Sequence, residues 1–212
     1  MITKCLTLTA ALLGGAVLAV PPALAESRAP SLKPALLVSE DVGDDFVPNG
    51  TKNRSPLLAR HAHTKPCAKA VNGLIPFYRS KTATWLMRDG VTEGVNEFIV
   101  NGSAAQIDGL ERAAKVLVRD CGHVKARGAS VRETINRLSV GKLGSATYGI
   151  KFRAQEPDAE IGPIMAVDLV VIRDGNTIAL VEHNGFYARF EPELTGDVAT
   201  TAATKLHEAL NG

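Results

Sequence analysis

The segment 163–184, which reads PIMAVDLVVIRDGNTIALVEHN, decides the fold of this chain. Two β-prone runs flank Asp174-Gly175, and Asp-Gly between such runs favours a two-residue hairpin turn. The first run, 164–172, is almost continuously apolar, as expected of a central strand that is covered on both faces. Asp168 interrupts this run, and an unpaired buried charge is costly. We therefore expect Asp168 to pair with a lysine or arginine, rather than to line a cavity.

A second hairpin pattern lies earlier in the chain. Residues 81–100 hold two β-prone runs around Asp89-Gly90, and a two-residue turn there would place Trp85 opposite Gly94. Residues 147–154 predict another strand, because apolar and polar side chains alternate along them. The apolar face of that strand comprises Tyr148, Ile150, Phe152 and Ala154.

The segment between these strands predicts the longest helix. Ser103 and Gln106 have the spacing of a capping box at its start, and Gly122 is placed to end it. One apolar stripe of the helix comprises Ile107, Leu110, Ala114, Leu117, Val118 and Cys121. The opposite, solvated side carries Glu111, Lys115 and Arg119.

Shorter elements complete the predicted fold. We expect a short helix capped by Ser39 and ended by Gly43, a loop over 47–63, a helix over 65–73, a strand over 131–140 and a closing helix over 195–210. Strands with helices to cover them predict the α+β class: a single twisted antiparallel sheet with helices packed on it. We find no internal repeat and expect no second domain.

Residues 1–25 have the pattern of a secretory signal peptide. Lys4 precedes the apolar run 6–20, and the small residues of Ala23-Leu24-Ala25 predict cleavage between Ala25 and Glu26. The apolar run is shorter than the roughly 20 residues that span a bilayer, so we expect no membrane anchor after cleavage.

The predicted cleavage divides the chain into three parts. Residues 1–25 are removed, residues 26–34 form a flexible lead-in, and residues 35–212 form one domain. The predicted product is secreted, and we expect it to be a monomer.

Cleavage also changes the cysteine count from three to two. Cys5 leaves with the signal peptide, and Cys67 and Cys121 remain. Two cysteines in an exported chain predict one disulfide, with two free thiols or a pair of metal ligands as the alternatives. Metal ligation is disfavoured because neither cysteine has a CxxC partner. A bridge of this span would stabilise the fold by about 4 kcal/mol on the chain-entropy model.

Composition and charge exclude several classes of function. The chain has 212 residues, of which 45% are hydrophobic and 22% charged, with a formal net charge of +2. This balance is that of a globular protein rather than a disordered one. A charge so near zero gives no electrostatic case for nucleic-acid binding.

The sequence offers no clear catalytic, metal or cofactor motif. No Gly-x-Ser-x-Gly elbow is present, and His61 and His63 have no acidic or cysteine ligand nearby in the sequence. Glu182 and His183 are adjacent in a predicted strand, so they point to opposite faces and do not share a site. We therefore expect no metal, no cofactor and no catalytic residue, and the sequence names no ligand-binding residue.

The order of several motifs resembles a known family. These motifs are Leu36-Leu37-x-x-Glu40-Asp41-Val42, Pro66-Cys67-Ala68 at the start of a helix, Asp120-Cys121 at the end of the long helix, the segment 167–176, and an alanine-rich closing helix. Together they resemble the PknH-like extracellular sensor domain of actinobacteria, and the resemblance covers nearly all of residues 35–210.

The resemblance implies a binding or sensing module without catalysis. Members of that family are extracytoplasmic, with a twisted antiparallel sheet, packed helices and a cleft for an unidentified ligand. By position the resemblance also supports a bridge between Cys67 and Cys121. The chain differs from the kinase version in having no kinase segment and only one possible disulfide, so direct signalling across a membrane is not expected.

We therefore expect a secreted ligand-binding domain whose partner is an unknown small molecule or a cell-envelope component. One alternative is a secreted hydrolase whose site assembles only in the fold, and another is an interaction module that uses a hairpin edge. A deep apolar cleft with few convergent polar groups favours ligand binding. A histidine within hydrogen-bond reach of a serine or carboxylate in that cleft would instead indicate an enzyme.

Overall fold

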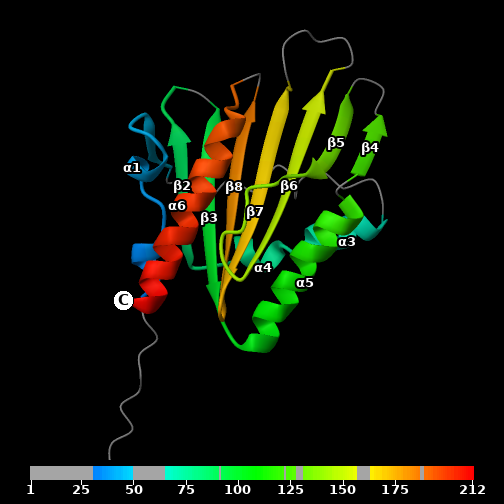
Figure 1. The fold of residues 1–212 in the computed structure, drawn as a ribbon. Helices are drawn as coiled ribbons and strands as arrows, with labels where there is room; N and C mark the ends of the chain where they lie inside the picture. The colour runs from blue at the N-terminus through cyan, green and yellow to red at the C-terminus, as the bar shows by residue number, and fades with distance from the viewer. Residues whose placement is uncertain are drawn as a thin grey trace, which may run out of the picture.

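The hairpin of β7 (Met165–Asp174) and β8 (Thr177–Phe186) lies at the centre of the sheet, as its apolar sequence predicts. The computed structural model describes residues 31–49, 65–90, 92–121, 123–127, 131–156, 163–186 and 189–212. Eight strands of these segments form one antiparallel sheet in the order β1-β2-β3-β8-β7-β6-β5-β4 (Figure 1). The predicted α+β class, one antiparallel sheet with packed helices, is confirmed.

The remaining elements frame this hairpin. The other strands are β1 (Phe46–Pro48), β2 (Thr82–Arg88), β3 (Glu93–Asn101), β4 (His123–Arg127), β5 (Arg132–Arg137) and β6 (Ala146–Gln155). The helices are α1 (Ser39–Val42), α3 (Lys65–Asn72), α4 (Ile75–Tyr78), α5 (Ala104–Cys121) and α6 (Pro192–Asn211), with a short 3₁₀ turn at Lys33–Ala35.

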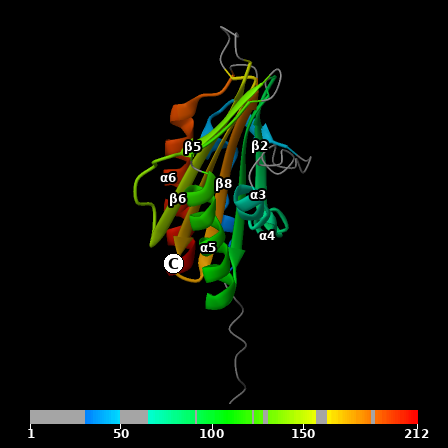
Figure 2. The ribbon, with the colours of Figure 1, turned by 90° about the vertical axis from the view of Figure 1, so that its right-hand side faces the viewer.

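Both faces of the sheet are covered by helices. Alternate residues of β7 point to opposite faces: Val167, Leu169 and Val171 pack in one cluster with Ile107 and Leu117 of α5. Val170 and Ile172 pack on the other face, in a cluster with three residues of α6, namely Val198, Ala199 and Ala202. Figure 2 shows α6 on one side of the sheet and α3 and α4 on the other. This double cover explains why β7 is apolar along nearly its whole length.

Most predicted helices and strands are confirmed, with corrections at their ends. Helix α5 follows Ser103, whose Oγ accepts the backbone N–H of Gln106 at 3.4 Å. The short helix α1 is capped differently from the prediction, because Val38 and not Ser39 is the N-cap residue. Asp41 satisfies the start of that helix by accepting the Val38 N–H at 2.8 Å.

Four elements were not anticipated from the sequence, namely β1, β4, α4 and the 3₁₀ turn Lys33–Ala35. Strand β1 begins one residue before the predicted loop 47–63 and continues into it, and its three residues pair with β2. Strand β4 adds a fifth strand after α5, and α4 follows α3 after a turn at Gly73-Leu74. Strand β1 has only three residues, too few to show an alternation of apolar and polar side chains. It is recognised as a strand only through its pairing with β2.

The predicted register of both hairpins is wrong: each residue pairs with a partner two positions further along the chain than predicted. Met87 lies opposite Gly94, and Trp85 lies opposite Asn96 rather than Gly94, so the first connection spans 89–92. This longer connection brings Arg88 Nη1 within 2.6 Å of Glu93 Oε2 on a largely buried face. In this register the buried carboxylate of Glu93 keeps a cationic partner, and a buried charge without one would be costly.

The second hairpin has its two-residue turn one position later than predicted. Asp174 pairs with Thr177, so the turn consists of Gly175 and Asn176. Gly175 has φ 56°, a left-handed conformation that glycine adopts without strain. Asp174 stays in the strand, where its carboxylate lies 2.9 Å from Nδ1 of His207 on α6.

The predicted disulfide is present. Cys67 of α3 and Cys121 of α5 are bonded, with their Cα atoms 5.0 Å apart and a sequence separation of 54. Both are fully buried. The bond therefore joins the two helices inside the core, where they cover the same face of the sheet.

The predicted signal peptide and its cleavage between Ala25 and Glu26 lie outside the described residues, as do His61, His63 and Gly122. Within the described segments, no helix is both long enough and apolar enough to cross a membrane.

Candidate functional site

Asp168 has the cationic partner that its sequence context predicts. Arg153 Nη1 lies 2.6 Å from Asp168 Oδ1, and the hydroxyl of Thr195 donates to Asp168 Oδ2 at 3.0 Å. Arg153 comes from the neighbouring strand β6, and Thr195 comes from the first turns of α6. The carboxylate thus joins two strands to the helix that covers them.

His183 continues this network toward β3. Its Nδ1 lies 2.8 Å from Thr195 Oγ1 and its Nε2 lies 3.0 Å from Glu93 Oε1. Because the single hydroxyl hydrogen of Thr195 is directed to Asp168, we assign the hydrogen between Thr195 and His183 to Nδ1. Thr195 is then an acceptor toward His183, whereas a catalytic hydroxyl donates to its base.

Arg88 connects the other end of the network to two further segments. Its guanidinium lies 2.6 Å from Glu93, 2.7 Å from Glu191 and 2.9 Å from Asp45. The hydrogen bond from Arg88 lowers the pKa of Glu191, and the same bond raises the pKa of Arg88. One arginine therefore holds together the hairpin end, the segment before β1 and the start of α6.

Burial decides what this network does. Glu93 and His183 have no exposed surface, and Asp168 and Thr195 are each 1% exposed. The Phe190 ring stacks on His183 at 4.3 Å between centroids, and Arg153 lies over the same ring at 4.5 Å. A histidine does lie within reach of a carboxylate, but both side chains are fully buried. The network therefore fastens α6 to the sheet.

Glu93 and Thr195 were missed by the sequence interpretation. Glu93 opens a strand whose first seven residues are buried, but the sequence TEGVNE around it is mixed in polarity and gives no sign of that burial. As expected from strand alternation, Glu182 points away from His183. It accepts hydrogen bonds on the opposite face, from Tyr78 at 2.6 Å and from Asn96 at 3.1 Å.

The open pocket between α5 and the sheet has a different character. We name it the α5 pocket; its volume is about 570 Å³, and it is lined by Arg112, Lys115, Val116, Val118, Arg119, Arg137 and Tyr148. A smaller pocket of about 270 Å³ adjoins it and shares Val118, Arg137 and Tyr148. Pockets of this size hold small molecules.

Tyr148 is held in place by a carboxylate beside the α5 pocket. Its hydroxyl donates to Glu111 Oε1 at 2.7 Å, and burial, with this hydrogen bond, raises the pKa of Tyr148 to about 12. Glu111 also pairs with Arg173, and the bonds from Tyr148 and Arg173 lower the pKa of Glu111. Arg173 lies outside the pocket lining, and its guanidinium is shared between Glu111 and Asp108.

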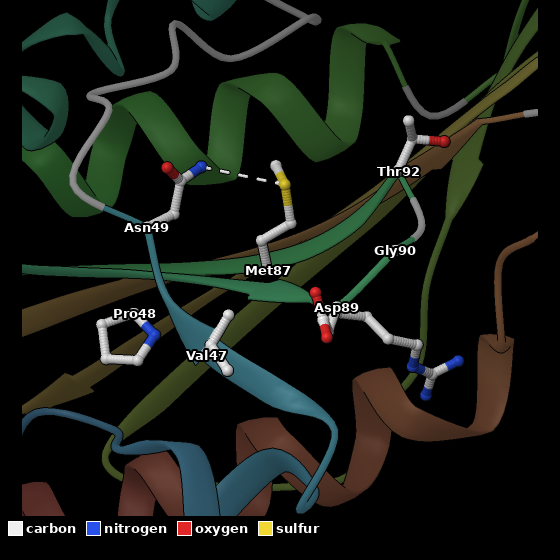
Figure 3. A pocket seen from close by; sticks show the side chains of 8 residues that line it. Val47, Pro48, Asn49, Met87, Asp89, Gly90 and Thr92 are labelled. Carbon is white, nitrogen blue, oxygen red and sulfur yellow. Dashed lines mark hydrogen bonds between the residues drawn. The ribbon is translucent and has the colours of Figure 1, made fainter.

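Two other pockets are weaker candidates. One of about 390 Å³ lies at the sheet edge, where Val47, Pro48 and Asn49 of the β1 region meet Met87 and Asp89 (Figure 3). Its cation is Arg88, whose guanidinium already pairs with three carboxylates. The other, of about 550 Å³, lies beside Ser31, Lys33 and Arg79 and has no aromatic side chain among its described lining residues.

Two aspartates near the N-terminal end of the described chain also lie in ion pairs. Asp41 pairs with Lys205, and Asp45 pairs with Arg88. Within the segments that the structure describes, no three histidine, cysteine, aspartate or glutamate side chains gather closely enough to hold a metal ion.

The fold and these pockets define the chain as an α+β protein with a disulfide-linked helix layer and an open pocket beside it. No family model matches the chain, and no curated protein matches it. Among solved structures, the chain is similar to the extracellular domain of PknH from Mycobacterium tuberculosis, with a TM-score of 0.50 and 14% identity over 82% of this chain and 93% of that one. The fold expected from the resemblance is thus confirmed.

A second solved structure is a putative uncharacterized protein from Mycobacterium smegmatis. It has a TM-score of 0.48 and 12% identity, over 84% of this chain and 97% of that chain.

Proposed function

We propose that this protein is an extracytoplasmic, sensor-like domain that binds a small molecule in the α5 pocket and performs no chemistry on it. The observation that carries the proposal is the pocket itself, which combines two valines and a tyrosine ring with four basic side chains. Apolar and aromatic walls with a few polar or charged groups are typical of ligand-binding sites.

Two further observations support this function. The fold is similar to that of a domain described as extracellular, and a buried disulfide is typical of proteins in oxidising compartments. The pocket also lies beside α5, the helix that the disulfide joins to α3. A wall that is fixed in this way suits a preformed site, because less conformational entropy is lost on binding.

The test is methyl NMR of residues 26–212 during titration with a library of small aryl fragments, both neutral and charged. We expect binders to shift the methyl signals of Val116 and Val118, which line the α5 pocket. Val198 is the matched control, because it lies on α6 and packs against the opposite face of the sheet, and its signals are expected to stay in place. If fragments bind but none of them shifts the methyl signals of Val116 or Val118, the assigned site is wrong.

The hydrolase alternative is tested on the same protein with chromogenic esters, phosphates and glycosides. We expect no turnover above the buffer rate. Turnover that disappears in the His183→Gln variant, while the unfolding transition is retained, would show that the buried network opens and acts as a catalytic site.

A further inference from the structure

We propose that the α5 pocket selects anionic ligands that carry an apolar body, such as an aryl or alkyl group bearing a carboxylate, sulfonate or phosphate. This inference rests on the proposed function and specifies the ligand class of the same site. It is carried by the placement of four cations and three apolar side chains around one hollow.

The cations of the pocket outnumber the anions around them. Arg112, Lys115 and Arg137 are exposed, and within the described segments none of them pairs with a carboxylate. Arg119 is the exception, because Asp120 lies 2.5 Å from its Nε. No described lining residue is acidic. A chain with a net charge of only +2 therefore concentrates positive charge at this pocket.

The cations come from different elements and converge on one space. Arg112 and Lys115 lie on α5, whereas Arg137 ends β5 across the pocket. A bound anion between them would meet positive charge from two sides, which a basic stripe along one helix does not provide. Three cations around a single hollow suit one small anionic group better than the extended backbone of a nucleic acid, which needs a longer basic track.

The apolar wall indicates what else the ligand carries. Val116 and Val118 of α5 face the same hollow as Tyr148 of β6, and the hydrogen bond to Glu111 keeps Tyr148 in position. Apolar surface of this kind favours the burial of aryl or alkyl groups. A bare inorganic anion would leave that wall unused, and a cationic ligand would be repelled.

The test compares two fluorescent probes that share one aromatic body. The anionic probe is 8-anilinonaphthalene-1-sulfonate, and the neutral probe is N-phenyl-1-naphthylamine, which lacks the sulfonate. Titrated into residues 26–212, the anionic probe is expected to bind about tenfold more tightly than the neutral one. Its affinity is expected to fall as NaCl rises from about 0.05 to 0.5 M, because exposed ion pairs are screened by salt.

Matched variants locate the site. The double variant Lys115→Gln/Arg137→Gln is expected to weaken the anionic probe about tenfold and to leave the neutral probe unchanged. Lys81→Gln is the charge control, because Lys81 is exposed and outside this pocket, and it is expected to change neither affinity. Val116→Asn is expected to weaken both probes. Thermal unfolding of each variant checks that it is folded.

The outcomes separate the two proposals. Equal affinity for both probes, with Val116→Asn weakening both, would overturn the anionic class and leave the α5 pocket as the binding site. Probe binding that neither Val116→Asn nor the double variant changes would overturn both proposals, because the probes would then bind elsewhere. If Lys81→Gln lowered the affinity for the anionic probe as much as the double variant does, the effect would be one of general charge. That result would also overturn the anionic class.

Discussion

The carboxylate of Asp168 joins β7, β6 and α6 through one ion pair and one hydrogen bond. Its need for a cation could be predicted from the apolar sequence around it. The identity of that cation could not, because Arg153 reaches Asp168 only through the pairing of β6 with β7. The contacts of Thr195 with Asp168 and His183 could not be predicted either, since sequence patterns do not show which helix residue will lie over which strand.

Replacing Asp168 by asparagine tests this pairing. The Asp168→Asn variant keeps the shape of the side chain but leaves the Arg153 guanidinium without its counter-charge. We expect a loss of about 2 to 3 kcal/mol in the free energy of unfolding, somewhat below that for a fully buried pair because Arg153 is partly exposed. Urea denaturation measures it. In a double-mutant cycle with Arg153→Gln, additive losses would mean that the two side chains are not coupled.

Glu97 gives the stability a pH dependence. It is fully buried, and its Oε2 accepts the Leu37 N–H at 2.8 Å. Burial raises its pKa to about 8, and the nearby charges of Lys205 and Asp41 act in opposite directions. Since the folded pKa lies above the unfolded one, the folded state binds more protons between pH 4.5 and about 8. This group therefore costs increasing stability as the pH rises through that window.

The Glu97→Gln variant should remove this dependence. We expect it to be more stable than the parent at pH 9, by about 5 kcal/mol at most, and nearly equal to it at pH 4.5. Urea denaturation at a series of pH values measures both curves. Curves that stay parallel across the window would show that Glu97 does not titrate differently in the two states.

At the level of elements, local patterns predicted the existence of strands and helices better than their register. Residues 147–154 and α5 follow their periodicity closely, because each buries one face of its own. In the observed registers Arg88 meets Glu93, and Gly175 takes the left-handed turn position. These are interactions across strands, which a turn motif alone does not include.

The link between α3 and α5 supplies a prediction at this scale. Replacing both cysteines, as Cys67→Ala/Cys121→Ala, is expected to lower the free energy of unfolding by about 4 kcal/mol, because the unfolded chain regains the entropy of a long loop. Chemical denaturation measures the loss, and mass spectrometry of the alkylated parent counts its free thiols. Two alkylated thiols in the native parent protein would contradict the bridge.

At the level of the whole molecule, the α+β class could be predicted because hairpins and helices are local in sequence. The α5 pocket could not, because its lining comes from α5, β5 and β6, which meet only after the sheet forms. Lys115 and Arg119 were correctly expected on the solvated side of the helix. Their role beside Arg137 depends on the fold.

Export of the whole chain is a further prediction. Expressed with its own N-terminus in a secreting bacterium, the protein is expected in the medium or cell envelope with Glu26 as its first residue. Mass spectrometry of the intact product determines this start. The Ala25→Arg variant, which places a large charged residue before the cut, is expected to stay uncleaved, and efficient cleavage of it at the same bond would contradict the assigned site.

The most direct test of the central claim is a crystal structure of residues 26–212 bound to 8-anilinonaphthalene-1-sulfonate. We expect the aromatic body against Val116, Val118 and Tyr148, with the sulfonate within about 3 Å of Lys115, Arg112 or Arg137. Density for the probe at another surface, with the α5 pocket empty, would contradict the claim that this pocket is the binding site.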